Sequence, residues 1–298
     1  MKKCRSVFFS FSALMFFFCV CLTAQAQDEY PVWPDKAPGV TEETPDAKNR
    51  GGAFSRVTKP TIRVFVPKNK TSDACVVLLP GGAYQVCGND VGQAQFFADR
   101  GITAVLLKYR VPRPKGMPKH IPAFQDAQRA IRLTRSMAEK YGFDPERIGV
   151  MGGSAGGHLV TMCCTSSSIQ SYEPIDEIDK LPTHVAFGIA KYPAYVLEDG
   201  RDQANDSKTK GNYAKMVDDF IFDSKTCPMC FVHGDADVYS PMGSVALYHK
   251  LRTMNIPAEL HIWAKAPHGF GKINDTNREQ VGHWLNAAWE WMQVMKFN

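Results

Sequence analysis

A serine set among glycines is the feature of this sequence with the clearest chemistry. Residues 152–156 read Gly-Gly-Ser-Ala-Gly, which fits the pattern G-x-S-x-G. They lie between a short apolar run, residues 148–151, and a helix-forming run that begins at Gly156. In such a strand–turn–helix context the serine occupies a tight, strained turn, and its neighbours must be small because the strand and the helix meet closely. The pattern predicts that Ser154 is a nucleophile.

A serine hydroxyl needs a base that takes its proton before it can attack a carbonyl carbon. Of the eight histidines, His268 has the context that such a base requires. It lies in the turn Pro267-His268-Gly269, after the last predicted strand and before the last predicted helix. His158 lies one helical turn past Ser154 and is interpreted as a packed or capping residue. We predict that His268 is the base.

The acid that orients this histidine is expected between the serine and the histidine in the sequence. The run His233-Gly234-Asp235-Ala236-Asp237 follows a predicted strand and offers two carboxylates. We favour Asp237, because the loop can turn it back towards His268, whereas Asp235 suits an Asx hydrogen bond within the turn. Asp235 stays an alternative. The acid would hold the imidazole in the required tautomer and stabilise its protonated form.

Backbone N–H groups are expected to stabilise the negative charge that develops on the attacked carbonyl oxygen. Pro80-Gly81-Gly82-Ala83 follows the predicted strand 75–79, and glycines let the backbone approach the oxygen. We predict an oxyanion hole made by the N–H groups of Gly82, Ala83 and Ala155. Each donor of this kind lowers the barrier by roughly 3 kcal/mol.

The elements that must position these residues alternate between apolar β-type runs and longer helical patterns. Continuous apolar strands separated by helices predict an α/β fold with a mostly parallel central sheet and helices on both of its faces. Polar segments at 166–183 and 194–226 are expected to cover the edge of the sheet where the site lies. The predicted strands are 62–66, 75–79, 103–109, 148–151, 185–190, 229–232 and 259–263, and the predicted helices are 92–100, 123–141, 156–165, 242–254 and 277–295.

The sequence begins with a pattern typical of a signal peptide. Three cations, Lys2, Lys3 and Arg5, precede an apolar stretch at 7–22, and Ala24-Gln25-Ala26 offers a cleavage site. We predict a signal peptide at 1–26, an irregular arm at 27–60 and a catalytic domain at 61–298, with export to the periplasm or the outside of the cell. A lipid anchor on Cys19 or Cys21 is the less favoured alternative.

Charge and cysteine usage exclude several other classes of protein. Loss of the three cations of the signal peptide lowers the formal net charge from +5 to +2, so no nucleic-acid partner is expected. The apolar run at 7–22 is short for a membrane span and ends in a cleavage signal, so no membrane span is expected in the mature chain. Six of the nine cysteines remain, and we interpret Cys75, Cys163 and Cys164 as packed apolar residues. Cys227 and Cys230 have redox spacing but lack a thioredoxin-like setting, so no redox function is expected. His, Cys and carboxylate residues show no metal-ligand spacing along the sequence, so no metal or other cofactor is predicted.

Taken together, these motifs resemble the α/β-hydrolase superfamily over about residues 60–297. The run of motifs looks like an exported bacterial esterase branch that includes acetylxylan and feruloyl esterases, and the opening Val32-Trp33-Pro34-Asp35 is similar to the mature N-terminus of those proteins. Pro80 departs from the histidine that usually stands there. The charged residues of 126–132 are interpreted as structural.

The resemblance implies hydrolysis of a carboxylic ester through an acyl-enzyme, with an acetylated plant polysaccharide or oligosaccharide as substrate. Tyr84 and Tyr192, together with Tyr195 and Trp263, are candidates for lining a sugar platform. A feruloyl esterase or an oligopeptidase-like hydrolase is an alternative. A non-catalytic carbohydrate-binding protein on the same fold is an alternative of another class.

Overall fold

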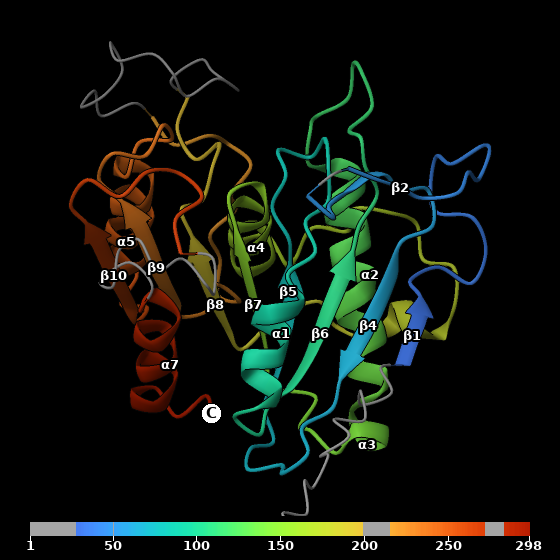
Figure 1. The fold of residues 1–298 in the computed structure, drawn as a ribbon, viewed down its shortest axis with the longest axis horizontal. Helices are drawn as coiled ribbons and strands as arrows, with labels where there is room; N and C mark the ends of the chain where they lie inside the picture. The colour runs from blue at the N-terminus through green and yellow to red at the C-terminus, as the bar shows by residue number, and fades with distance from the viewer. Residues whose placement is uncertain (1–27, 50, 199–214, 272–282) are drawn as a thin grey trace, which may run out of the picture.

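An eight-stranded sheet forms the centre of the structure, a computed structural model that describes residues 28–49, 51–198, 215–271 and 283–298 (Figure 1). The signal peptide predicted at 1–26 lies outside the described residues. The strand order is β1-β4-β6-β5-β7-β8-β9-β10, and six consecutive strands from β6 to β10 run parallel. The strands are β1 (Asp28–Pro31), β4 (Thr61–Phe65), β5 (Cys75–Leu79), β6 (Thr103–Lys108), β7 (Ile148–Gly153), β8 (Phe187–Lys191), β9 (Met229–Gly234) and β10 (Ala258–Trp263).

Helices cover both faces of this sheet. One face packs against α2 (Ile121–Ser136), α4 (Ala155–Thr165) and α5 (Met242–Thr253), and the other packs against α1 (Val91–Ala98) and α7 (Trp284–Val294). Every residue of β5 is buried, and successive side chains enter the two hydrophobic cores in turn. This two-sided burial explains why the parallel strands read as continuous apolar runs. The predicted α/β class and mostly parallel sheet are confirmed.

The N-terminal arm differs from the prediction that residues 27–60 are irregular. β1 pairs antiparallel with β4, with Tyr30 opposite Ile62, and so adds an edge strand to the main sheet. Two further short strands, β2 (Ala47–Lys48) and β3 (Phe54–Arg56), pair with each other. The prediction was wrong because these strands are short and polar, so that their pairing depends on neighbours that are distant in the sequence.

The predicted helix 123–141 is also divided. α2 ends at Ser136, the φ of −94° and ψ of 4° at Met137 leave the helical region, and a short α3 (Ala138–Tyr141) follows. Gly142, with φ of 70°, ends α3 in the left-handed conformation that glycine adopts without strain. The first part of the predicted helix 277–295 lies outside the described residues, and α7 begins at Trp284.

The arm is tied to the domain through a buried carboxylate on α2. The Asp126 side chain has 0% exposure and accepts hydrogen bonds from Trp33 Nε1 at 2.7 Å and from Arg110 Nε at 2.9 Å. Its second oxygen accepts from the Arg110 backbone N–H at 2.8 Å. Since buried charges require partners, Asp126 holds the arm, the end of β6 and α2 in one arrangement.

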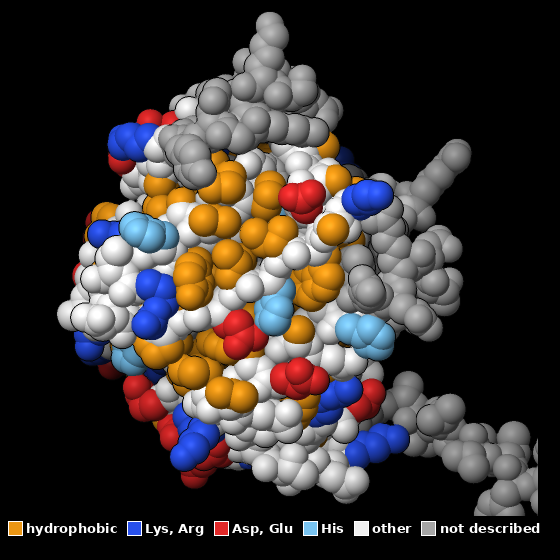
Figure 2. All heavy atoms as spheres, turned by 90° about the vertical axis from the view of Figure 1, so that its left-hand side faces the viewer, with side chains coloured by type: hydrophobic (Ala, Val, Ile, Leu, Met, Phe, Trp, Pro, Cys, Tyr) orange, Lys and Arg blue, Asp and Glu red, His pale blue; other side chains and the backbone are white. Residues whose placement is uncertain are grey.

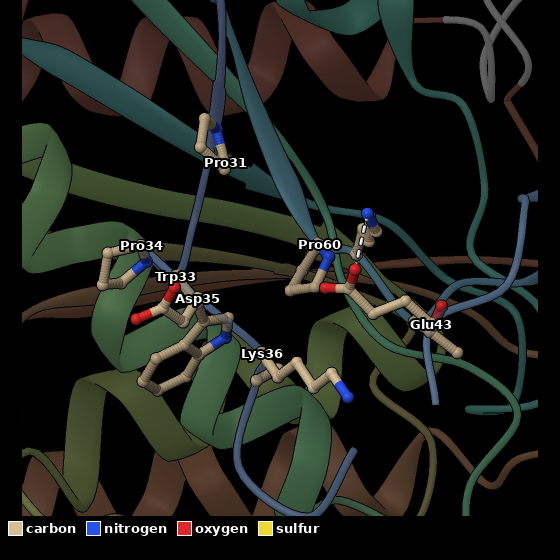
Figure 3. A pocket seen from close by; sticks show the side chains of 10 residues that line it. Pro31, Trp33, Pro34, Asp35, Lys36, Glu43 and Pro60 are labelled. Atoms are coloured by element: carbon tan, nitrogen blue, oxygen red, sulfur yellow. Dashed lines mark ion pairs between the residues drawn. The ribbon is translucent and has the colours of Figure 1, made fainter. Parts of the chain in front are cut away.

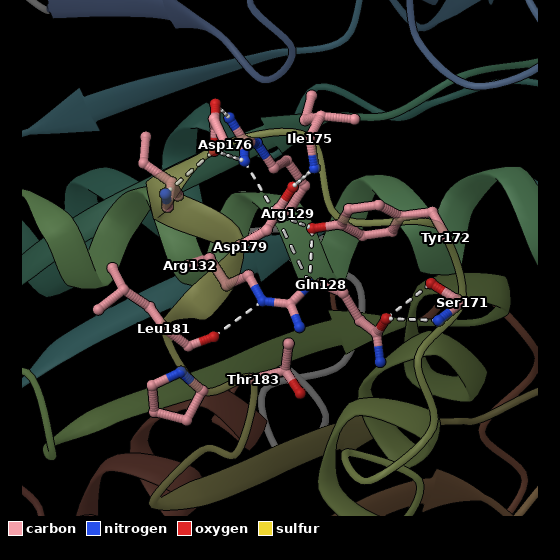
Figure 4. A network of polar contacts seen from close by, with 12 residues as sticks. Gln128, Arg129, Arg132, Ser171, Tyr172, Ile175, Asp176, Asp179, Leu181 and Thr183 are labelled. Atoms are coloured by element: carbon pink, nitrogen blue, oxygen red, sulfur yellow. Dashed lines mark hydrogen bonds and ion pairs between the residues drawn. The ribbon is translucent and has the colours of Figure 1, made fainter.

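A second polar network fastens the segment after α4 to the outer side of α2 (Figure 4). Arg129 donates to Asp176 Oδ1 at 2.6 Å and lies 2.8 Å from Asp179 Oδ1, at the short 3-10 helix η1 (Glu177–Lys180). Tyr172 donates to the same Asp179 oxygen at 2.5 Å. These contacts confirm that the charged residues of 126–132 are structural.

β10 forms the opposite edge of the sheet and is partly open to solvent. Ile262 is 41% exposed on this strand. Figure 2 shows hydrophobic side chains gathered on the side of the molecule that lies on the left in Figure 1, with histidine and charged side chains among them. The described helices include none that is both long and apolar enough to cross a membrane.

Replacing Asp126 with alanine should lower the free energy of unfolding by about 3–5 kcal/mol, since the change leaves Arg110 buried without its charge partner. Urea denaturation measures this loss. Glu177→Gln is the matched control, because the Glu177–Lys180 ion pair is exposed at 86% and 71% and should contribute little. Equal stability of the two variants would contradict the role given to Asp126.

Candidate active site

Ser154 lies at the sharp turn between β7 and α4. Its φ of 59° and ψ of −123° are strained for a residue with a side chain. The glycines around it are required by close packing of backbones: a Cβ on Gly152 would lie 2.2 Å from the Leu79 carbonyl oxygen, and one on Gly156 would lie 2.0 Å from the same atom. The local sequence therefore forces the turn that presents the serine hydroxyl.

Three predicted residues meet at the carboxyl ends of parallel strands. The Ser154 hydroxyl lies 2.8 Å from His268 Nε2, and His268 Nδ1 lies 2.9 Å from each carboxylate oxygen of Asp237. Ser154 follows β7, Asp237 follows β9 and His268 follows β10. This is a continuous chain of hydrogen bonds from a carboxylate to a hydroxyl, the arrangement in which an imidazole can take the serine proton.

The structure brings Asp237, rather than Asp235, to the histidine. The Asp237 side chain has 0% exposure, and its Oδ1 also accepts from the Tyr239 backbone N–H at 2.7 Å. Asp235 is exposed, and its backbone N–H donates to the Trp263 carbonyl. The buried position of Asp237 strengthens its hydrogen bond to His268, because the local dielectric constant is low.

The predicted oxyanion loop lies directly against the nucleophile. A Cβ on Gly81 would lie 2.6 Å from the Gly153 carbonyl oxygen and 3.3 Å from the Cβ of Ser154, so only a residue without a side chain fits there. Gly82 has φ of 135° and Ala83 has φ of 56°. Within the described chain, no group accepts a hydrogen bond from the N–H of Gly82, Ala83 or Ala155. These three donors are available to a developing oxyanion, as the prediction requires.

Tyr84 does not line an open surface, which makes its assignment to a sugar platform wrong. Its side chain is 1% exposed and its hydroxyl lies 2.9 Å from His158 Nδ1. Its φ of 56° turns the ring inward, beside Tyr109 and Tyr195. His158 is packed, as expected, and it acts as the polar partner of Tyr84 rather than as a helix cap.

Tyr192 packs against the imidazole ring of His268. Its ring lies 4.7 Å from the His268 ring, between centroids, although its side chain is only 7% exposed. Tyr239 lies on the same imidazole at 4.9 Å. The two aromatic rings hold the base in position, and contact between Tyr192 and a substrate stays a prediction.

Two buried groups near the site have pKa values that the sequence does not predict. Burial lowers the pKa of Lys191 to about 8, against the opposing effect of Asp90, and its ammonium lies 4.1 Å from the centre of the Trp284 ring. Burial also lowers the pKa of His233 to about 4, although the charge of Asp237 opposes this shift. Neither residue carries a sequence signal, since lysine at the end of a strand and histidine before glycine are both common in exposed turns.

A cavity of about 400 Å³ lies on the N-terminal arm, apart from the triad (Figure 3). Trp33, Pro34 and Lys36 line it, and Glu43 there forms an ion pair with Lys59 at 2.5 Å. The residues that line this cavity include no nucleophile beside a base. We therefore place the candidate active site at Ser154 alone.

Comparison with known proteins agrees with this geometry. The BD-FAE family model matches residues 62–220, which is more than half of the chain. The chain belongs to this family. An acetylxylan esterase of Xylanibacter ruminicola is 25% identical over 75% of this BD-FAE chain, and endo-1,4-beta-xylanase B of Butyrivibrio fibrisolvens is 26% identical over 80%. The chain spans only 47% and 38% of the lengths of these two relatives.

Solved structures agree as well. An acetyl ester-xyloside bifunctional hydrolase from Caldicellulosiruptor lactoaceticus superposes with a TM-score of 0.68 at 26% identity, covering 91% of this chain and 97% of the other. Esterase 2 of Thermogutta terrifontis has the same fold, with a TM-score of 0.64 at 22% identity and coverage of 80% and 90%. The α/β-hydrolase fold and the likeness to acetylxylan esterases are thus confirmed, and export stays a prediction.

His233 should make the stability of the BD-FAE chain depend on pH. Between pH 6.5 and about 4 the unfolded chain binds a proton at this histidine that the folded chain does not bind, so the free energy of unfolding falls as the pH falls through this window. The slope from one such group is about 1.4 kcal/mol per pH unit. Urea denaturation at several pH values should give a slope for His233→Gln that is shallower by this amount. Equal slopes would contradict the buried neutral histidine.

Proposed function

We propose that this chain is a serine ester hydrolase that removes acetyl groups from plant polysaccharide or oligosaccharide. The observation that carries the proposal is the hydrogen-bonded series from Asp237 through His268 to Ser154, with both links shorter than 3 Å. The named relatives include an acetylxylan esterase and an acetyl ester-xyloside hydrolase, which supports the acetyl ester as substrate.

The proposed reaction has two steps. The Ser154 hydroxyl attacks the ester carbonyl carbon while His268 Nε2 takes its proton, and Asp237 stabilises the imidazolium that forms. The N–H groups of Gly82, Ala83 and Ala155 donate to the oxyanion. His268 then gives its proton to the sugar oxygen as the bond between that oxygen and the carbonyl carbon breaks, so the sugar leaves as an alcohol and an acetyl-serine remains. Water attacks this ester with His268 as base, which releases acetate and restores the serine.

Three substitutions test whether Ser154 is the nucleophile and whether Asp237, rather than Asp235, is the acid. Ser154→Ala should abolish turnover of p-nitrophenyl acetate, leaving only the small rate supplied by the oxyanion hole. Asp237→Asn should lower kcat by ~10⁴-fold, since the imidazole loses the partner that fixes its tautomer. Asp235→Asn is the matched control and should leave kcat within a few-fold of the original. Loss of activity in Asp235→Asn with activity kept in Asp237→Asn would reverse the assignment.

A rate comparison on four substrates tests the proposed specificity. The purified protein should release acetate from acetylated xylan and hydrolyse p-nitrophenyl acetate, and it should act poorly on methyl ferulate and on a peptide anilide. Preference for ferulate would favour the feruloyl esterase alternative, and preference for the anilide would favour the oligopeptidase-like one. Inactivity on all four, with xylan still bound, would favour a non-catalytic carbohydrate-binding protein.

A further inference from the structure

Three side chains that are far apart in the sequence meet beside the oxyanion loop. His120 is the residue before α2, His158 lies in the second turn of α4, and Asp219 belongs to the segment before β9. Their ligand atoms, two imidazole nitrogens and one carboxylate oxygen, all lie within 4.8 Å of one another. Because these three residues are far apart in the sequence, their spacing matches no metal-ligand motif.

Two distances within the group are close to those between neighbouring ligand atoms of a tetrahedral metal site. Asp219 Oδ2 lies 3.1 Å from His158 Nε2 and 3.2 Å from His120 Nδ1. In a tetrahedral zinc site, metal–ligand bonds of about 2.0–2.2 Å separate neighbouring ligand atoms by about 3.3 Å. One carboxylate and two imidazoles are also a common set of three zinc ligands, which leaves a fourth position for water.

The hydrogen bonding of His120 is incomplete without a further partner. Its Nδ1 is buried and makes no hydrogen bond, because its contact with Asp219 lacks the required alignment. His120 is 8% exposed and His158 is fully buried. A buried nitrogen with no hydrogen bond is costly, and coordination of a cation would remove that cost.

The second ring nitrogen of His158, Nδ1, makes the kind of hydrogen bond that orients a metal-binding histidine. Histidine that binds a metal usually makes a hydrogen bond through its second ring nitrogen, which fixes the direction of the first. The Tyr84 hydroxyl lies 2.9 Å from His158 Nδ1, so that Nε2 faces Asp219. The rings of Phe220 and Tyr195, with centroids 5.1 Å and 6.1 Å from that of His158, form an apolar wall around it.

We propose that His120 Nδ1, His158 Nε2 and Asp219 Oδ2 bind one divalent transition-metal ion of the zinc type, with water as the fourth ligand. The site is separate from the catalytic triad. It joins the start of α2, the helix that follows the nucleophile and, through Tyr84, the loop that carries the oxyanion donors.

Metal binding to the purified, untagged protein tests this proposal. After treatment with a chelator, titration with Zn²⁺ followed by calorimetry should show one ion bound per chain, and Co²⁺ should give the intense visible absorption of a tetrahedral site. His120→Ala and Asp219→Asn should each remove this binding. Tyr84→Phe should weaken it by about 10–100-fold, since the hydrogen bond that orients His158 is lost.

His184→Ala is the matched control, because His184 also contacts a carboxylate, Glu146, at 2.9 Å but lies outside the group. This variant should bind zinc as the original chain does. Zinc should also raise the thermal unfolding temperature of the original chain and of His184→Ala, but not that of His120→Ala. Binding that is unchanged in folded His120→Ala, or that disappears only in His261→Ala at the Cys230–Glu259–His261 group, would overturn the proposal.

Discussion

The close approach of backbones at the end of β7 is the constraint on which the candidate site depends. Gly152 and Gly156 both lie against the carbonyl oxygen of Leu79, at distances that no side chain permits. This contact forces the chain to reverse within a few residues, so Ser154 takes a strained conformation in front of α4. It also brings the end of β5 next to the nucleophile. The oxyanion loop and the serine are therefore positioned by a single packing requirement.

Burial sets the electrostatics around this point. Asp237 is the buried carboxylate that contacts His268. Burial keeps the histidine behind it, His233, neutral, against the opposing effects of the Asp237 charge and of the hydrogen bond to the Tyr239 carbonyl. A second protonated imidazole at 3.6 Å would compete with His268 for the carboxylate. The low pKa of His233 thus leaves the charge of Asp237 to His268.

The sequence predicts the parts of this protein whose signals are local. The G-x-S-x-G run, the strand-end loop of Asp237 and the turn of His268 each carry their own pattern, and parallel strands must bring their carboxyl ends to one edge. The sequence does not predict contacts between residues that are far apart along the chain. Trp33 reaches Asp126 over 93 residues, His158 reaches Asp219 over 61, and β1 joins the sheet only because β4 is beside it. Tyr84 was misplaced for the same reason, since its inward direction depends on the backbone conformation of the loop.

The position of His268 has a consequence for how activity arises during synthesis. The oxyanion loop and Ser154 precede β8 in the sequence, whereas Asp237 and His268 follow β9 and β10. As the chain emerges from the ribosome, the nucleophile elbow can pack well before its base exists. In the proposed mechanism, the serine of a nascent chain therefore lacks its base until β10, the last parallel strand, has joined the sheet. Hydrolytic activity would then report completion of the sheet, because a chain that stops short of β10 has a nucleophile but no means to activate it.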